Sequence, residues 1–162
     1  MNPTYPDVRL ARPEDREAIL GLTTLLHGEN GLFAISPRKV EIMLDRFYNR
    51  EGALIGVIGE IGAPVATIYL GIDQLIYTDD WTLVEQWNFV HPDHRRSNFA
   101  SQLICYAKGL SDQFKLPLLV GILSNSRTEA KARLYERHLD KAGAYFIYNR
   151  ASLEHAAPSW QK

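Results

Sequence analysis

The sequence has few of the features that mark secreted or membrane-spanning proteins. Cys105 is the single cysteine among 162 residues, so no intramolecular disulfide can form, which fits a reducing compartment. No apolar run approaches membrane-spanning length, and residues 1–6 have neither the basic start nor the apolar core of a signal peptide. Repeats and low-complexity tracts are missing too. These absences predict a soluble, cytoplasmic protein without membrane contact.

The sequence also lacks an excess of either charge. Its 18 basic residues nearly cancel its 19 acidic residues, so the overall balance indicates no polyanionic partner. A length of 162 residues is enough for one domain with a proper hydrophobic core. We expect residues 1–152 to form this single domain and residues 153–162, with Pro158 and Trp160, to form a C-terminal tail.

Apolar periodicity predicts helices and strands that alternate along the chain. We expect strands at residues 7–11, 53–58, 65–72, 81–90, 117–123 and 144–148. We expect helices at residues 13–28, 36–47, 99–110 and 126–142. The order β-α-α-β-β-β-α-β-α-β predicts an α/β (α+β) fold, with a mixed central sheet of about six to seven strands flanked by about four helices.

A short basic turn joins the strand at residues 81–90 to the following helix. It carries the adjacent arginines Arg95 and Arg96. A strand that turns sharply into a helix leaves several backbone N–H groups without partners at the helix start, where the helix dipole adds partial positive charge. Such a turn suits a phosphate group, and two arginines strengthen the attraction with charged donors. The sequence therefore predicts a strand–turn–helix that binds an anionic ligand.

This turn resembles a known family. Arg95-Arg96-Ser97-Asn98-Phe99-Ala100, with the lead-in Val90-x-Pro92-x-x-Arg95, resembles the acyl-CoA-binding loop of the GNAT N-acetyltransferase superfamily. The predicted element order is also that of the GNAT fold, so the resemblance spans nearly the whole chain. Asn98 stands where the family has glycine. Because Asn tolerates positive φ better than other non-glycine residues, we expect Asn98 to have a positive φ.

The resemblance implies acetyl-CoA as the acyl donor. In the family, the strand before the loop binds the pantetheine arm, and one of its backbone N–H groups polarises the thioester carbonyl. Phe89 and Val90 match this part of the strand, and the N–H groups from about Arg95 to Ala100 match the pyrophosphate site. The residues implied in acetyl-CoA binding are Phe89, Val90, Arg95, Arg96, Ser97, Asn98, Phe99, Ala100 and Ser101.

A second match supplies candidate catalytic residues. Ala132-Arg133-Leu134-Tyr135-Glu136 resembles the family segment whose tyrosine protonates the leaving thiolate, which makes Tyr135 the candidate general acid. Packing on the core is the alternative for this tyrosine. Glu85 lies in an otherwise apolar strand, where desolvation raises the pKa of a carboxyl group, so it is the candidate general base. A solvent-facing position is the alternative for Glu85. We expect His138 on the surface.

Other polar residues have weaker assignments. His27 and Glu29 belong to the segment between the first two helices, which borders the acceptor pocket in the family; contact with substrate and a solvated loop are the two readings. His91 and His94 flank Asp93, but no other His or Cys pair has ligand spacing, so we expect no metal site.

These observations together predict an enzyme of the EC 2.3.1 type that transfers an acetyl group from acetyl-CoA to a primary amine of a small molecule or peptide, by direct attack in a ternary complex. One alternative is a catalytically inactive acyl-CoA-binding module of the same fold, because Asn98 replaces the family glycine. A nucleic-acid-binding domain is a further alternative, but the chain has no wider basic and aromatic stripe. The resemblance is compatible with a homodimer.

Overall fold

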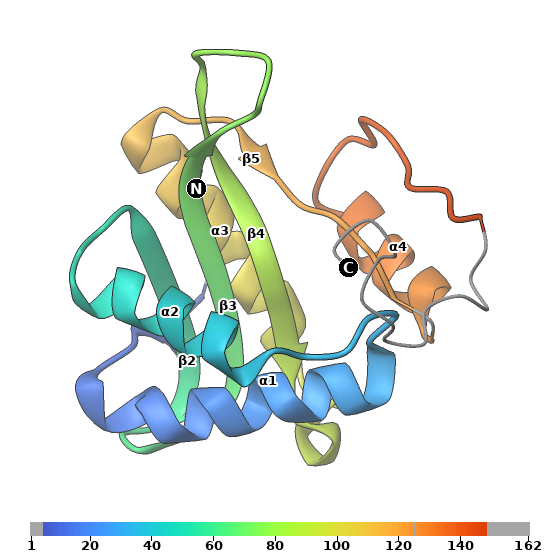
Figure 1. The fold of residues 1–162 in the computed structure, drawn as a ribbon. Helices are drawn as coiled ribbons and strands as arrows, with labels where there is room; N and C mark the ends of the chain where they lie inside the picture. The colour runs from blue at the N-terminus through green and yellow to red at the C-terminus, as the bar shows by residue number, and fades with distance from the viewer. Residues whose placement is uncertain (1–4, 125, 149–162) are drawn as a thin grey trace, which may run out of the picture.

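The computed structural model describes residues 5–124 and 126–148. Within these residues the chain forms one five-stranded sheet with helices on both faces (Figure 1). The strands are β1 (Val8–Leu10), β2 (Ala53–Glu60), β3 (Ala63–Gln74), β4 (Trp81–Val90) and β5 (Leu118–Leu119). The α-helices are α1 (Arg16–Asn30), α2 (Pro37–Tyr48), α3 (Phe99–Phe114) and α4 (Thr128–Glu136), and the 3-10 helices are η1 (Pro13–Asp15) and η2 (Pro92–His94).

The sheet has the order β1-β2-β3-β4-β5. Strands β1 to β4 form an antiparallel meander, whereas β5 runs parallel to β4 after the crossover through α3. Only two pairs join β4 to β5, namely Leu83 with Leu118 and Val84 with Leu119. Beyond Val84 the two strands separate, and α4 lies on the far side of the opening (Figure 1).

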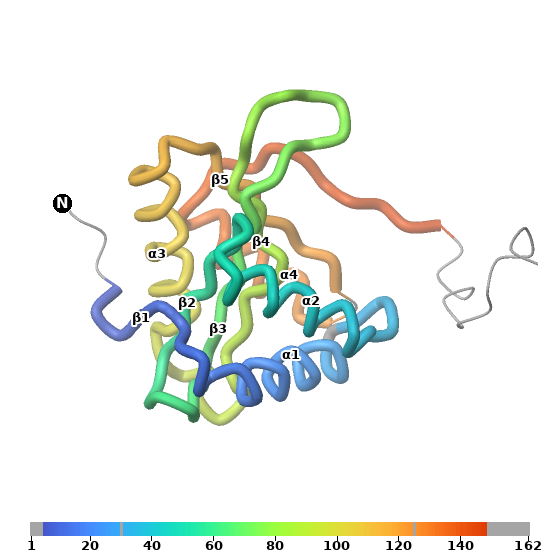
Figure 2. The backbone as a smooth tube through the Cα atoms, turned by 60° about the vertical axis from the view of Figure 1, so that its left-hand side comes forward, coloured from blue at the N-terminus to red at the C-terminus, as the bar shows by residue number. Residues whose placement is uncertain are grey.

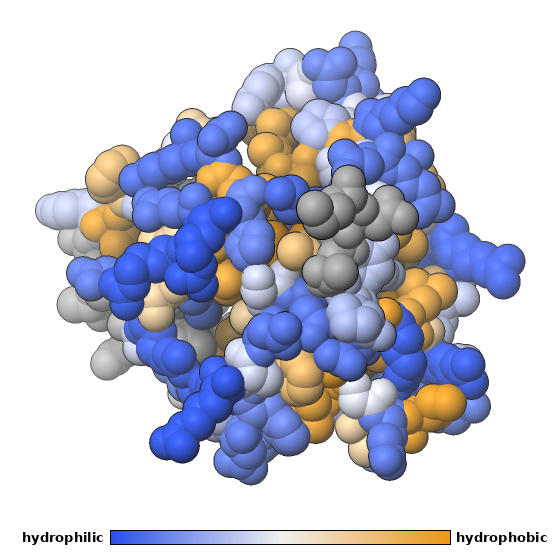
Figure 3. All heavy atoms as spheres, turned by 180° about the vertical axis from the view of Figure 1, so that it is seen from behind, coloured by the Kyte–Doolittle hydropathy of each residue, from blue (hydrophilic) through white to orange (hydrophobic). Residues whose placement is uncertain are grey.

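Helices α1 and α2 lie on one face of the sheet and α3 lies on the other (Figure 2). Each face therefore has its own core cluster. Ile19 and Leu44 pack with Trp87 beneath α1 and α2, while Leu103 and Ile68 pack beneath α3. Four of these side chains are fully buried and Trp87 is 5% exposed. A view from behind shows apolar residues in separate patches among hydrophilic side chains (Figure 3).

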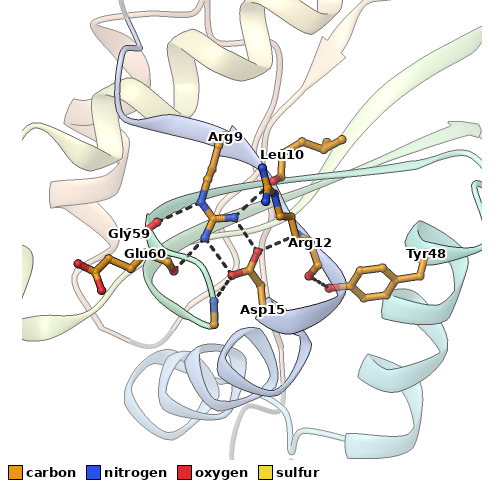
Figure 4. A network of polar contacts seen from close by, with 8 residues as sticks. Arg9, Leu10, Arg12, Asp15, Tyr48, Gly59 and Glu60 are labelled. Atoms are coloured by element: carbon orange, nitrogen blue, oxygen red, sulfur yellow. Dashed lines mark hydrogen bonds and ion pairs between the residues drawn. The ribbon is translucent and has the colours of Figure 1, made fainter.

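A buried ion pair anchors the start of α1. The Asp15 carboxylate is fully buried and accepts two hydrogen bonds from Arg9, at 2.7 and 2.9 Å. It also accepts from the backbone N–H groups of Arg12, at 2.7 Å, and Gly62, at 2.8 Å (Figure 4). Because these partners come from β1, from the loop after β1 and from the β2–β3 turn, one carboxylate joins three segments.

The predicted fold class is confirmed, with fewer strands than expected. Residues 117–123 form a strand only at Leu118–Leu119, because β4 turns away beyond that point. Residues 144–148 form no strand, although their apolar and aromatic composition favours one; strands need a paired neighbour, and no described segment pairs with them. Helix α4 ends at Glu136 rather than near residue 142.

Smaller differences concern the helix ends. Ser36 caps α2, since its side chain accepts a hydrogen bond from the Lys39 N–H at 3.4 Å. Helix α1 continues past Gly28 and ends before Gly31. None of the helices within the described residues is both long and apolar enough to cross a membrane. The predicted tail at residues 153–162 lies outside the described residues.

Candidate functional site

The separation of β4 from β5 leaves backbone groups of β4 without a strand partner. A β-bulge lies at this point: Tyr69 pairs with Trp87 and Leu70 pairs with Glu85, so Gln86 is an extra residue in β4. The His91 N–H donates to Val65 of β3 at 2.8 Å. The direction of the backbone N–H groups alternates along a strand. Because the His91 N–H points to β3, the N–H groups of Val90 and Asn88 point away from β3, toward the opening.

Two cavities lie in this opening. The first has a volume of about 140 Å³ and lies between the end of β4, the basic turn and α4. The second has a volume of about 310 Å³ and lies between the middle of β4, the end of α1 and residues 121–123. Asn88, Lys131 and Tyr135 line both cavities. These three side chains therefore form the wall across which a group could pass from one cavity to the other.

The basic turn contributes to the first cavity, but not with all of its residues. Phe89, Val90, Arg95, Ser97 and Ala100 line the cavity. Arg96, Asn98, Phe99 and Ser101 do not line it. Arg96 is exposed, and Ser101 shares a 2.7 Å hydrogen bond with the His138 ring. His138 is thus half-buried and bonded, not on the open surface as expected.

Arg95 is held by an acidic partner. Its guanidinium forms an ion pair with Glu29 at 2.5 Å and lies over the Phe89 ring, 5.7 Å from the centroid. Arg127 approaches the same carboxylate at 3.8 Å. The hydrogen bond from Arg95 lowers the pKa of the Glu29 carboxyl, and the charges of Arg127 and Lys131 add to this effect. In the first cavity, the positive charges of Arg95, Arg127 and Lys131 therefore all act on the Glu29 carboxylate.

The expectation of positive φ at Asn98 is wrong. Asn98 has φ −91° and ψ 15°, a conformation open to most residues. Its Oδ1 accepts a 2.8 Å hydrogen bond from the Gln102 side chain, one turn further along α3. This bond stabilises the start of the helix, and no residue with positive φ is needed there. Within the described residues, the Ala100 and Ser101 N–H groups have no acceptor, and they remain available at this helix N-terminus.

Glu85 lies on the wall of the second cavity and is half-buried. Burial raises the pKa of the Glu85 carboxyl to about 7, although a hydrogen bond from the Gly121 backbone, a hydrogen bond from Tyr135 and the charge of Lys131 act in the opposite direction. A carboxyl group with this pKa is present in both its protonated and its ionised form near neutral pH. It can therefore accept and release a proton.

Tyr135 faces Glu85 from α4. Its hydroxyl donates to Glu85 Oε2 at 3.3 Å, so α4 connects to β4 across the opening. Burial raises the pKa of the Tyr135 hydroxyl above its ordinary range, and the Glu85 charge adds to the rise. The hydroxyl is consequently protonated at neutral pH. The solvent-facing alternative for Glu85 differs from this arrangement, whereas a buried tyrosine with a bonded hydroxyl is also compatible with the core-packing alternative.

Two further residues of the wall were not predicted. Lys131 lies between Arg127 and Tyr135 at four-residue spacing, so the three side chains share one face of α4. That spacing was a readable signal. Asn88 has a buried Nδ2 atom without a hydrogen-bond acceptor among the described residues, although its amide is close enough to lower the pKa of Tyr135 slightly. A buried donor without a partner is unusual and suits a ligand atom.

The remaining predicted residues have simpler positions. His27 lines the second cavity, and its Nδ1 is 3.0 Å from the backbone carbonyl oxygen of Thr23. Glu29 lines the first cavity, and both residues lie in the last turn of α1 and not in the segment between the first two helices as predicted. His91 lies 3.6 Å from Asp93. Across residues 5–124 and 126–148, no cluster of His, Cys, Asp and Glu could hold a metal ion.

No family model matches the sequence, and no curated protein matches it. Solved structures do. Ribosomal-protein-alanine N-acetyltransferase from Brucella melitensis biovar Abortus 2308 is 19% identical, with a TM-score of 0.67 over 88% of this chain and 97% of that one. An aminoglycoside N-acetyltransferase in complex with CoA is 16% identical, with a TM-score of 0.63 over 88% of this chain and 98% of that one.

An integron cassette protein from the mobile metagenome of Cole Harbour Salt Marsh is also similar. It is 17% identical, with a TM-score of 0.69 over 98% of this chain and 95% of that one. At such identities the likeness concerns the fold. The chain has the fold of the GNAT acetyltransferases, as the basic turn and the element order predicted.

Proposed function

We propose that the chain is a single-domain N-acetyltransferase that moves an acetyl group from acetyl-CoA to a primary amine by direct attack in a ternary complex. The observation that carries this proposal is the pair of cavities that share one wall. Tyr135 borders both cavities and donates to Glu85, which borders only the second. The first cavity suits the donor, because it adjoins the basic turn, and the second suits the acceptor.

The donor is held by the first cavity. Arg95 and Arg127 supply positive charge for its phosphates, and the Ala100 and Ser101 N–H groups supply donors at the start of α3. Arg95 has to exchange Glu29 for a phosphate group. The N–H groups of Val90 and Asn88, which point away from β3, are suited to the pantetheine arm and the thioester carbonyl.

Glu85 is the general base of the proposed reaction. The amine nitrogen attacks the thioester carbon, the C–N bond forms, and the carbonyl electrons move to oxygen. As the intermediate collapses, the C–S bond breaks and the nitrogen loses one proton. Glu85 accepts that proton, because its pKa of about 7 leaves a useful fraction ionised at neutral pH.

Tyr135 is the general acid. The departing sulfur needs one proton, and the Tyr135 hydroxyl is protonated and borders the donor cavity. Tyr135 loses a proton to sulfur, and Glu85 gains one from nitrogen. Through the hydrogen bond between the two residues, the proton on Glu85 can return to Tyr135. An acceptor that arrives as an ammonium ion first loses one proton to solvent. For the neutral amine that then attacks, the proton count closes within the Glu85–Tyr135 pair. No metal enters this scheme.

Two arginines of the basic turn provide a matched test. Arg95 lines the donor cavity, whereas its neighbour Arg96 is exposed and does not. Acetyl-CoA should raise the melting temperature of the wild type by mass action, and thiol should be released when an amine is added. Arg95→Ala should abolish most of the shift, and Arg96→Ala should keep it. Equal losses in both variants would place the phosphates elsewhere. Binding without thiol release for any amine would favour the inactive acyl-CoA-binding module.

A further inference from the structure

The second cavity contains one acidic and one basic group of opposite charge. Glu85 contributes the carboxyl group and Lys131 the ammonium group. Each influences the charge of the other, so the two are close in space. The other ionisable side chains that line this cavity are His27, Tyr135 and Tyr145. The His27 Nδ1 atom lies 3.0 Å from the Thr23 carbonyl oxygen. The nearest further carboxylate of the opening, Glu29, is already paired with Arg95.

Lys131 forms no direct ion pair within the described residues, although the charges of Glu85 and Glu29 act on it. Its side chain is half-buried, and its ammonium group forms no ion pair or hydrogen bond with any residue in 5–124 or 126–148. A charge withdrawn from water without a partner is costly, so such groups are usually completed by an opposite charge. Burial lowers the pKa of Lys131, because the charged form loses hydration. An anionic group on the ligand would complete it.

Apolar side chains also contribute to the wall of the second cavity. Trp87 is 5% exposed, and Leu26 and Ile122 are half-buried beside it. A polycation would find one carboxylate here, already required as the base, and would place a second ammonium group near Lys131. Like charges at short distance are unfavourable in a partly buried site. The charge pattern therefore disfavours acceptors with several amines.

Building on the proposed function, we propose that the acceptor is a zwitterion of the amino-acid class, whose amine meets Glu85, whose carboxylate meets Lys131 and whose apolar or aromatic body lies against Trp87. Glu85 and Lys131 come from β4 and α4, on the two sides of the opening. The acceptor thus joins the same two elements that the Glu85–Tyr135 hydrogen bond joins.

The test measures thiol release from acetyl-CoA with four acceptors: an aromatic amino acid, the amine left after its decarboxylation, spermidine and an aminoglycoside. The amino acid should have a kcat/KM about 10- to 100-fold above that of its decarboxylated amine, because a charge-assisted contact is lost with the carboxylate. Lys131→Met should lower kcat/KM for the amino acid about 10- to 100-fold more than for the decarboxylated amine, so that the preference disappears. Arg133→Met, on the exposed side of α4, should keep the preference.

Several outcomes would overturn the acceptor class while leaving the acetyltransferase standing. These are equal rates for the amino acid and its amine, better turnover of spermidine or the aminoglycoside, and an equal loss for both acceptors in Lys131→Met. The melting temperature supplies a reading independent of turnover: with CoA present, the amino acid should stabilise the wild type more than its amine does. Stabilisation by the amino acid without thiol release from any acceptor would overturn the proposed function alone. No stabilisation and no turnover of the amino acid would overturn the acceptor class.

Discussion

Asp15 and Glu85 are two carboxyl groups partly or fully withdrawn from bulk water, and their pKa values are shifted in opposite directions. At Asp15 burial favours the neutral acid, but hydrogen bonds from Arg9, Arg12 and Gly62 outweigh it and lower the pKa to about 2. At Glu85 the hydrogen bonds are fewer and burial prevails, so the pKa rises to about 7. The number of donors facing each carboxylate decides the difference.

The contrast separates a group that holds the fold from a group that can react. The Asp15 carboxylate is hydrogen-bonded by groups of the protein itself, so its charge serves to hold three segments together (Figure 4). Glu85 faces a cavity, accepts hydrogen bonds from Tyr135 and the Gly121 backbone, and lies near the Lys131 ammonium group, which forms no direct ion pair within the described residues. Strongly perturbed pKa values cluster at functional sites. The direction of the pKa shift and the hydrogen-bonding capacity that the protein leaves unused distinguish the functional carboxyl group.

The largest expected effect removes proton transfer at the Glu85 site. Tyr135→Phe and Glu85→Gln should each lower kcat by about 10²–10⁴-fold, since general acid–base groups contribute that much, while CoA affinity changes little. Because the proton passes between the two residues, the double variant should be little worse than either single one. Turnover and melting temperature should be measured on the same preparation. Normal kcat in Tyr135→Phe would leave solvent as the proton source.

The next effect removes charge at the Asp15 site. Asp15→Asn should lower the free energy of unfolding by about 3 kcal/mol, toward the lower end for a broken buried pair because Arg9 remains partly exposed. Urea unfolding gives the value. Asp45→Asn is a suitable control, since the Arg16–Asp45 pair lies at the surface and exposed pairs contribute about 0–1 kcal/mol. Similar losses for both variants would contradict a special role for Asp15.

The pH dependence of stability should have opposite signs at the two sites. The folded state holds the Glu85 proton more tightly than the unfolded state, so this contribution to stability is lost as pH rises from 4.5 to about 7. The Asp15 contribution is instead lost as pH falls from 3.8 to about 2. Glu85→Gln should therefore gain about 1–2 kcal/mol on the wild type between about pH 5 and about pH 8, allowing for solvent screening. Parallel pH profiles would contradict this.

The smallest effect concerns Glu29, which resembles Asp15 in its partner but stands in a cavity. Glu29→Gln should free Arg95 for a phosphate and tighten CoA binding by about fivefold, since a half-exposed ion pair contributes about 1 kcal/mol. Calorimetric titration with CoA measures the change. Glu129→Gln removes an exposed carboxylate paired with Arg133 and serves as the control. Weaker binding in Glu29→Gln would mean that Glu29 helps the donor site.

The sequence predicted those parts of the fold that depend on local signals. Helix α2, strand β4 and the basic turn before α3 follow from composition and spacing over a few residues. Residues 144–148 have strand composition but no strand, because pairing depends on a distant neighbour. Asn98 was expected to imitate glycine, whereas a side-chain bond to Gln102 makes that unnecessary.

The site was predictable residue by residue but not in its connections. Glu85 and Tyr135 were chosen separately, and only the fold brings them to 3.3 Å. The Glu29–Arg95 pair joins residues 66 positions apart, which no local pattern encodes. Lys131 was overlooked because a lysine on a polar helix usually faces water; its place in the wall depends on how α4 lies across the opening.

The bulge at Gln86 shifts the alternation of side-chain directions along β4 by one residue. In a regular strand, residues three places apart point to opposite faces, yet Glu85 and Asn88 both influence the Tyr135 hydroxyl. The extra position brings them to one side while the β3–β4 ladder continues on each flank. Deleting Gln86 would restore an even ladder and separate the two groups. The presence of an extra residue at position 86 is therefore more important for the geometry of the site than the identity of its side chain. Insertion or deletion of one residue there should be tolerated far less than substitution of Gln86.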